Sequence, residues 1–101
     1  MIDLKRLQKK IYQNKIDKKF NVTDIAMEFC LTHEELSEAY RAHYKKLPNV
    51  GEELADVAIY LLGIAQILNV DLEKEILQKV TKNKNRVYEQ INGVNTKIEN
   101  Q

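Results

Sequence analysis

Hydrophobic residues recur at every third or fourth position along most of the chain, which predicts helices from end to end. The first predicted helix spans about residues 2–18 and is apolar on one side only, with lysines on the other side. The second is capped by Asn21 or Thr23 and runs to about Lys46. The segment 47–51, LPNVG, then interrupts the helical pattern.

The second half of the chain contains two further predicted helices. One covers about residues 50–68 and is apolar on most sides after its first turn, so it belongs at the centre of the fold or at a subunit interface. Asp71 is the expected N-cap of the last helix, whose apolar positions extend to Val87. No strand-like alternation is evident, and the polar tail over about 93–101 is expected to fray. Four helices with short connections predict an all-α, antiparallel four-helix bundle-like domain.

Composition limits the classes of function. With 101 residues, the chain fits one domain, 1–101. Sixteen Lys and Arg against 15 Asp and Glu give no global charge that would favour nucleic acid or a membrane surface, so neither is an expected partner. The single cysteine, Cys30, excludes an intramolecular disulfide and a multi-cysteine zinc site, and its apolar neighbours predict a core position. No apolar run approaches the ~18 residues of a membrane span, and a cytoplasmic location is expected.

Acidic residues are concentrated in two short stretches on either side of the break at 47–51. EELSE places Glu35 and Glu38 three residues apart, and GEELAD places Glu53 and Asp56 at the same spacing. Residues three apart on a helix are neighbours, so each pair shares a face. If the two helices form a hairpin, the pairs can face each other across it.

Converging carboxylates remain ionised together only with a cation among them, and a hard divalent ion such as Mg²⁺ prefers oxygen ligands. The competing interpretation is that both pairs lie on solvated helix faces. A di-iron bundle is a poorer match, because it needs Glu-x-x-His pairs. His33 and His43 do not have that spacing and are expected on the surface.

The combination of EELSE with ELADVAIYLLGIAQILNVDLEKEILQKVTKNKNRVY resembles the MazG-like nucleoside triphosphate pyrophosphohydrolases, an all-α superfamily. The resemblance covers residues 20–88. It implies Mg²⁺-dependent hydrolysis, with Mn²⁺ as an alternative ion, of a nucleoside triphosphate to the monophosphate and pyrophosphate. By position it assigns the metal to Glu35, Glu38, Glu53 and Asp56. Glu34 and Glu35 are the catalytic acids that it implies, with Glu34 as an accessory acid or the group that orients the attacking water.

The resemblance also implies substrate contacts. Lys79, Asn83 and Arg86 match a basic motif of the last family helix and would contact the triphosphate or sugar, whereas their alternative role is a solvated basic face. Tyr60, one turn after Asp56, matches an aromatic that approaches the nucleotide in related enzymes, and core packing is its alternative role.

Two further aromatic residues are weaker candidates for substrate contact. Phe20 is a candidate for stacking on the base, although a hydrophobic staple to the second helix is the competing role. Tyr88 lies near the position of a family aromatic, displaced by one residue.

Three hypotheses therefore stand. The first is a nucleotide pyrophosphohydrolase, with the removal of non-canonical or excess nucleotides as its candidate role. The second is a non-catalytic nucleotide-binding or structural helical module, and the third, an adaptor that binds nucleic acid through the basic first helix, is opposed by the near-neutral charge. So small a chain cannot easily cover an apolar third helix, and family members of this size are usually oligomeric, so self-association as a dimer or tetramer is expected.

Overall fold

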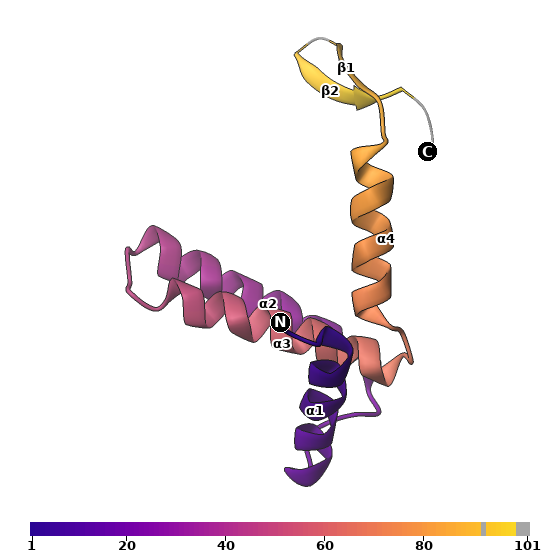
Figure 1. Ribbon diagram of the computed structural model, residues 1–101. Coiled ribbons are helices and arrows are strands. Elements are labelled where there is room, and N and C mark those ends of the chain that lie inside the picture. The colour runs from indigo at the N-terminus through magenta and orange to yellow at the C-terminus, as the bar shows by residue number, and fades with distance from the viewer. Residues whose placement is uncertain (92, 99–101) are drawn as a thin grey trace.

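The computed structural model describes residues 1–91 and 93–98, and they form four helices followed by a short β-hairpin (Figure 1). The elements are α1 (Leu4–Asp17), α2 (Ile25–Tyr44), α3 (Val50–Ile67), α4 (Leu72–Lys84), β1 (Tyr88–Ile91) and β2 (Val94–Lys97). The prediction of an all-α protein of four helices is confirmed. The hairpin was not expected. It pairs β1 with β2 in antiparallel register through Ile91 and Val94, in the region predicted as a helix end and a frayed tail, and residues 99–101 lie outside the described part.

Aspartates cap the starts of α1, α2 and α4. Asp71 caps α4 as predicted, and its carboxylate accepts a hydrogen bond from the backbone N–H three residues further on, at 3.1 Å. The prediction for α2 was wrong, because Asp24 caps this helix rather than Asn21 or Thr23. The side chain of Asn21 instead accepts a hydrogen bond from the backbone N–H of Asp24 at 3.0 Å, so it holds the capping residue in place.

The first three helices end without glycine. Lys19, Lys46 and Asn69 follow them in the left-handed conformation, with φ of 59°, 56° and 58°. In each case the next residue donates a backbone hydrogen bond of 2.8–2.9 Å to the carbonyl five residues earlier, which is the Schellman arrangement. As a result α2 ends at Tyr44, slightly earlier than the sequence predicted.

Helix α3 lies at the centre, as predicted, with α2 antiparallel to it on one side and α1 crossing it on another (Figure 1). The buried core is small and comes from two helices: Ala39 and Ala42 of α2, with Leu62, Ile64 and Ala65 of α3. The short alanine side chains allow α2 and α3 to approach closely.

The predicted four-helix bundle is not completed within one chain. Helix α4 turns away from α3 by 109° and contacts the rest of the protein mainly near its own start, against α1 (Figure 1). There the backbone N–H of Leu4 donates to Glu73 Oε1 at 3.0 Å. The side chain of Gln8, only 3% exposed, donates to the carbonyl of Val70 at 2.7 Å. The turn at Asn69 and these contacts fix the departure of α4 from the core.

The single chain is less compact than a typical monomer of its size. Its accessible area is 8,018 Å², whereas a compact 11.8 kDa monomer exposes about 5,900 Å². The radius of gyration is 16.9 Å, compared with about 13 Å for a compact domain of this length.

Within the described part of the chain, no single helix has the length and apolar character to cross a membrane, although α3 and α4 taken together as a bent pair meet both criteria.

Candidate functional site

Carboxylates from the two predicted pairs converge across the α2–α3 hairpin. One oxygen from each of Glu35, Glu38 and Glu53 lies within 4.8 Å of the other two. Asp56, the fourth predicted ligand, is outside this group, yet its charge acts on both Glu35 and Glu53. The structure therefore brings together three of the four residues that the sequence singled out as metal ligands, and places the fourth near enough for its charge to act on two of them.

The residue at which α2 ends explains how the acidic pairs of α2 and α3 come to lie at similar positions along the hairpin. An extended helix to Lys46 would have placed Glu38 too far from the turn to meet Glu53. Since α2 ends at Tyr44 and α3 begins at Val50, the offset is reduced to about 4.5 Å, slightly less than one helical turn, at 1.5 Å per residue. Side chains of glutamate length can span this difference.

Crowding of like charges is visible in the electrostatics of the site. Partial burial, followed by the charges of Glu38, Asp56 and Glu53, raises the pKa of Glu35 above its usual value. Partial burial also raises the pKa of Glu53, again with contributions from Glu38 and Asp56. The carboxylates therefore repel one another when ionised, and a bound cation would relieve this repulsion.

The oxygen positions suit a hard divalent ion. An octahedral Mg²⁺ with bonds of about 2.1 Å places its ligand oxygens roughly 3 to 4 Å apart. The three oxygens here are within 4.8 Å of one another, so small side-chain rotations bring them around one ion.

Glu38 and Glu53 also line a pocket of about 310 Å³ at the turn of the hairpin, together with Arg41 and Asn49. The side-chain amide of Asn49 donates to Glu53 Oε1 at 3.2 Å and holds that carboxylate. Sequence analysis did not single out Arg41, which lies one turn after Glu38 on α2. Its guanidinium is the cationic group of this pocket.

A second pocket of about 360 Å³ lies between α1 and α3, and its lining includes the two predicted aromatic residues Phe20 and Tyr60. Phe20 is 56% exposed, so it is not fully buried as a hydrophobic staple. Burial, followed by the charges of Glu35, Glu28 and other acids, raises the pKa of the Tyr60 hydroxyl. Tyr60, one turn after Asp56 on α3, therefore lines this pocket within range of the charges of the acidic site.

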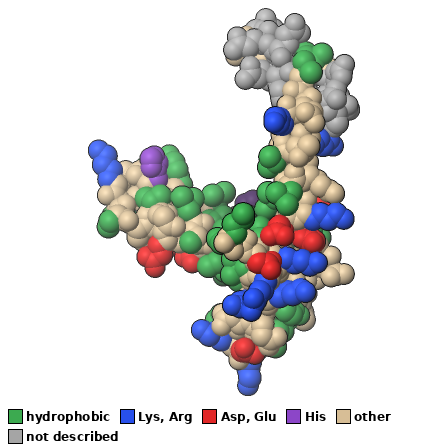
Figure 2. Space-filling view, in the orientation of Figure 1, with side chains coloured by type: hydrophobic (Ala, Val, Ile, Leu, Met, Phe, Trp, Pro, Cys, Tyr) green, Lys and Arg blue, Asp and Glu red, His purple; other side chains and the backbone are tan. Residues whose placement is uncertain are grey.

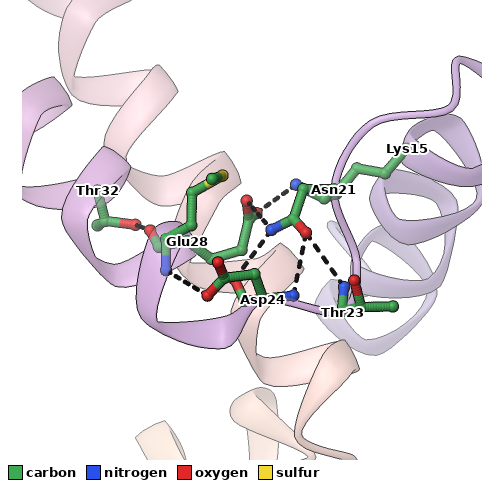
Figure 3. Close-up of polar contacts among 7 residues, drawn as sticks. Lys15, Asn21, Thr23, Asp24, Glu28 and Thr32 are labelled. Atoms are coloured by element: carbon green, nitrogen blue, oxygen red, sulfur yellow. Dashed lines mark hydrogen bonds and ion pairs between the residues drawn. The ribbon is translucent and has the colours of Figure 1, made fainter.

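A buried ion pair supports the wall of this pocket (Figure 3). Glu28 is only 1% exposed; its Oε1 pairs with Nζ of Lys15, and its Oε2 accepts a hydrogen bond from the Asn21 amide at 3.0 Å. Nζ of Lys15 also lies 5.6 Å from the centre of the Tyr60 ring, within cation–π range. Sequence analysis missed this network, although an acidic residue inside the apolar run IAMEFCL was an available signal.

The predicted substrate-binding residues of α4 are not brought to the acidic site within one chain. Lys79 and Asn83 are exposed on the part of α4 that extends away from the core (Figure 1). Arg86 lies beyond the end of the helix at Lys84, so the predicted shared helix face does not extend to it. Its Nε is buried and has no hydrogen-bond partner among the described residues. The side chain of Tyr88 lies outside what the structure describes.

The remaining predictions concern residues outside the site. Glu34 is exposed beside Glu35 on α2, and His33 and His43 are exposed as expected. Cys30 is exposed as well, so its predicted core position was wrong. The side of α2 that carries Cys30 faces away from α3, because Ala39 and Ala42 occupy the contact between these helices.

Comparisons with known proteins gave no match: no protein-family model, no curated protein and no solved structure corresponds to this chain.

Proposed function

We propose that this protein is a Mg²⁺-dependent nucleoside triphosphate pyrophosphohydrolase of the MazG-like type. The observation that carries the proposal is the convergence of Glu35, Glu38 and Glu53 from two facing helices, with their oxygens within 4.8 Å of one another. Partly buried carboxylates crowded in this way are costly unless a cation accompanies them. The pocket beside Tyr60 then provides space for the rest of a nucleotide.

Different acidic residues of the chain have different roles in such a reaction. Glu35, Glu38, Glu53 and Asp56 hold the ion, which when bound neutralises phosphate charge and lowers the pKa of water. Glu34, exposed next to the ligands, is the accessory acid that orients the attacking water. Phosphoanhydride hydrolysis depends mainly on positioning and charge neutralisation, so it needs no covalent nucleophile from the protein.

Basic side chains must also contact the triphosphate to neutralise its charge. Arg41 lines the pocket beside Glu38 and Glu53 and is the group available within the same chain. Lys79 and Asn83 on α4, and Arg86 just beyond its end, extend away from the acidic site, so we place them at the site of a neighbouring copy. The sites would then be completed across subunits.

Self-association of the chain, as a dimer or tetramer, is part of the proposal. Hydrophobic side chains cover much of the visible side of the α2–α3 hairpin and continue on α4 (Figure 2). Leu36, Tyr40 and Leu54 line an apolar hollow of about 470 Å³ on the hairpin, and Leu77 and Val80 of α4 are 64% and 60% exposed. A second copy that covers these surfaces would complete the helical bundle that one chain leaves open.

Pyrophosphate release tests the enzymatic proposal. Purified protein is incubated with Mg²⁺ and a panel of canonical and modified nucleoside triphosphates, and Glu38→Ala and Asp56→Ala are expected to reduce the rate by about 100-fold or more. Glu52→Ala is the matched control, because Glu52 is an exposed acid of the same run outside the converging group. Retained activity in Asp56→Ala, or no pyrophosphate from any triphosphate, contradicts the proposal.

The second candidate is a module that binds nucleotides without hydrolysing them. The observation that favours it is the distance of the α4 cations from the acidic site in one chain. Calorimetry that detects tight Mg²⁺-nucleotide binding by a protein without turnover would select this alternative.

A further inference from the structure

The pocket between α1 and α3 has the composition of a site for a planar ring. Phe20 and Tyr60 contribute aromatic faces, Ile11 and Ile59 contribute apolar surface, and Asn14 and Lys15 contribute polar groups. Aromatic side chains bind flat rings by stacking. Among the lining residues, Tyr60 is one helical turn from Asp56 on α3, the helix that also carries Glu53.

Lys15 occupies an unusual place in this wall. Its side chain is 13% exposed, its Nζ pairs with the buried Glu28, and the same Nζ lies 5.6 Å from the Tyr60 ring centre. An ammonium group has three N–H donors and no acceptor. Glu28 fixes the position of the group and takes one donor, so the group offers further donors at the edge of the pocket.

We propose that Lys15 is a specificity-determining residue, and that this pocket takes a nucleobase with a carbonyl oxygen at pyrimidine C4 or purine C6, as in uracil or guanine. A carbonyl oxygen accepts a hydrogen bond from the ammonium. The exocyclic amino group of cytosine or adenine at the same place would direct its own N–H toward a cation that cannot accept it. The inference rests on the proposed function for the identity of the ligand as a nucleotide.

Little water competes for this contact, because the side chains of both Lys15 and Glu28 are largely buried. A site built to hydrogen-bond one group discriminates strongly against an analogue that leaves the buried donor unpaired. We therefore expect the keto nucleotides, those of uracil and guanine, to bind at least about tenfold more tightly than the amino nucleotides, those of cytosine and adenine.

Binding of nucleoside monophosphates without divalent metal tests the inference. Uridine and guanosine monophosphates are compared with cytidine and adenosine monophosphates by NMR titration of the full chain, with Ile11, Ile59 and Gly63 as reporters. The wild type is expected to show the preference, and the double variant Lys15→Met with Glu28→Gln is expected to lose it. The double variant leaves no buried charge unpaired, and thermal melting checks its fold. Lys10→Met is the matched control, because Lys10 also lines the pocket without pairing with Glu28 in any described contact, so it should weaken all four ligands alike.

Equal affinity for keto and amino nucleotides in the wild type overturns the inference, as does a preference that survives the double variant. Reporter shifts that depend on protein concentration rather than ligand would show that a second copy fills the pocket, and this result also overturns it. Hydrolysis is measured separately. A protein that prefers uridine monophosphate but releases no pyrophosphate from any triphosphate would refute the proposed reaction and leave the role of Lys15 standing.

Discussion

The ion pair between Lys15 and Glu28 should be a major determinant of stability, and Lys15→Met tests this. The substitution keeps most of the length of the side chain and removes its charge. Glu28, which is 1% exposed, then keeps only the hydrogen bond from Asn21 at 3.0 Å. Its other oxygen, which paired with Lys15, is left buried without a cation.

The expected loss is about 3 kcal/mol. Removing one partner of a buried ion pair costs roughly 3–5 kcal/mol, and the lower end applies because Asn21 still donates to the carboxylate. For a domain of this size, 1 kcal/mol shifts the melting temperature by about 4–8 °C, so a decrease of roughly 12–24 °C follows. Adding Glu28→Gln to Lys15→Met removes the unpaired charge and should recover most of this loss.

Thermal and urea unfolding followed by far-ultraviolet circular dichroism measure the effect. All variants are compared at one protomer concentration, because the proposed self-association would make the melting temperature depend on concentration. Lys9→Met, an exposed lysine of the same helix, is the control and should change stability by less than about 0.5 kcal/mol. A loss below about 1 kcal/mol for Lys15→Met, or a double variant as unstable as the single one, would refute this reasoning.

Three further predictions follow from the site, the hinge and the exposed surface. Because the pKa values of Glu35 and Glu53 are raised in the folded protein, the folded state binds more protons above the usual value of 4.5, so their contribution to stability decreases as pH rises above that value. Metal-free melting curves at constant ionic strength should show a smaller decrease between pH 5 and 7 for Glu35→Gln than for wild type, and an equal decrease would contradict this. Gln8→Met should destabilise the fold by about 2 kcal/mol, since the Val70 carbonyl and its neighbours lose a buried partner, and urea unfolding measures the loss. Leu77→Lys should shift light-scattering mass toward the monomer with little change in helicity, and an unchanged mass would exclude α4 from the interface.

Local patterns predicted much of the fold and the acidic site. Helical periodicity placed α3 almost to the residue, and the spacing of three between Glu35 and Glu38 identified the face on which they meet Glu53. These features depend on neighbours in sequence, where the geometry of a helix is fixed. The cap at Asp24 was missed because several adjacent polar residues can each cap a helix.

Long-range features were less accessible from the sequence. Lys15 is one of several lysines on α1, and only the crossing of α1 over α3 selects it as the partner of Glu28. The divergence of α4 depends on contacts at its first turn rather than on its own pattern. The hairpin did have a signal, since Asn92-Gly93 is a preferred dipeptide for tight hairpin turns, and Gly93 has a φ of 78°.

The hydrogen bonds of Gln8 also determine how tightly the orientation of α4 relative to α1 and α3 is fixed. The Gln8 amide binds the Val70 carbonyl, and its oxygen accepts from the backbone N–H of Leu72, so one side chain of α1 holds both sides of the hinge. Helix α4, which follows the hinge, has 13 residues and is about 20 Å long. A rotation of about 10° at the hinge therefore moves its far end by roughly 3 Å, as much as the length of a hydrogen bond. Substitutions at position 8 should consequently alter which surfaces of two copies can meet, even in variants that remain folded.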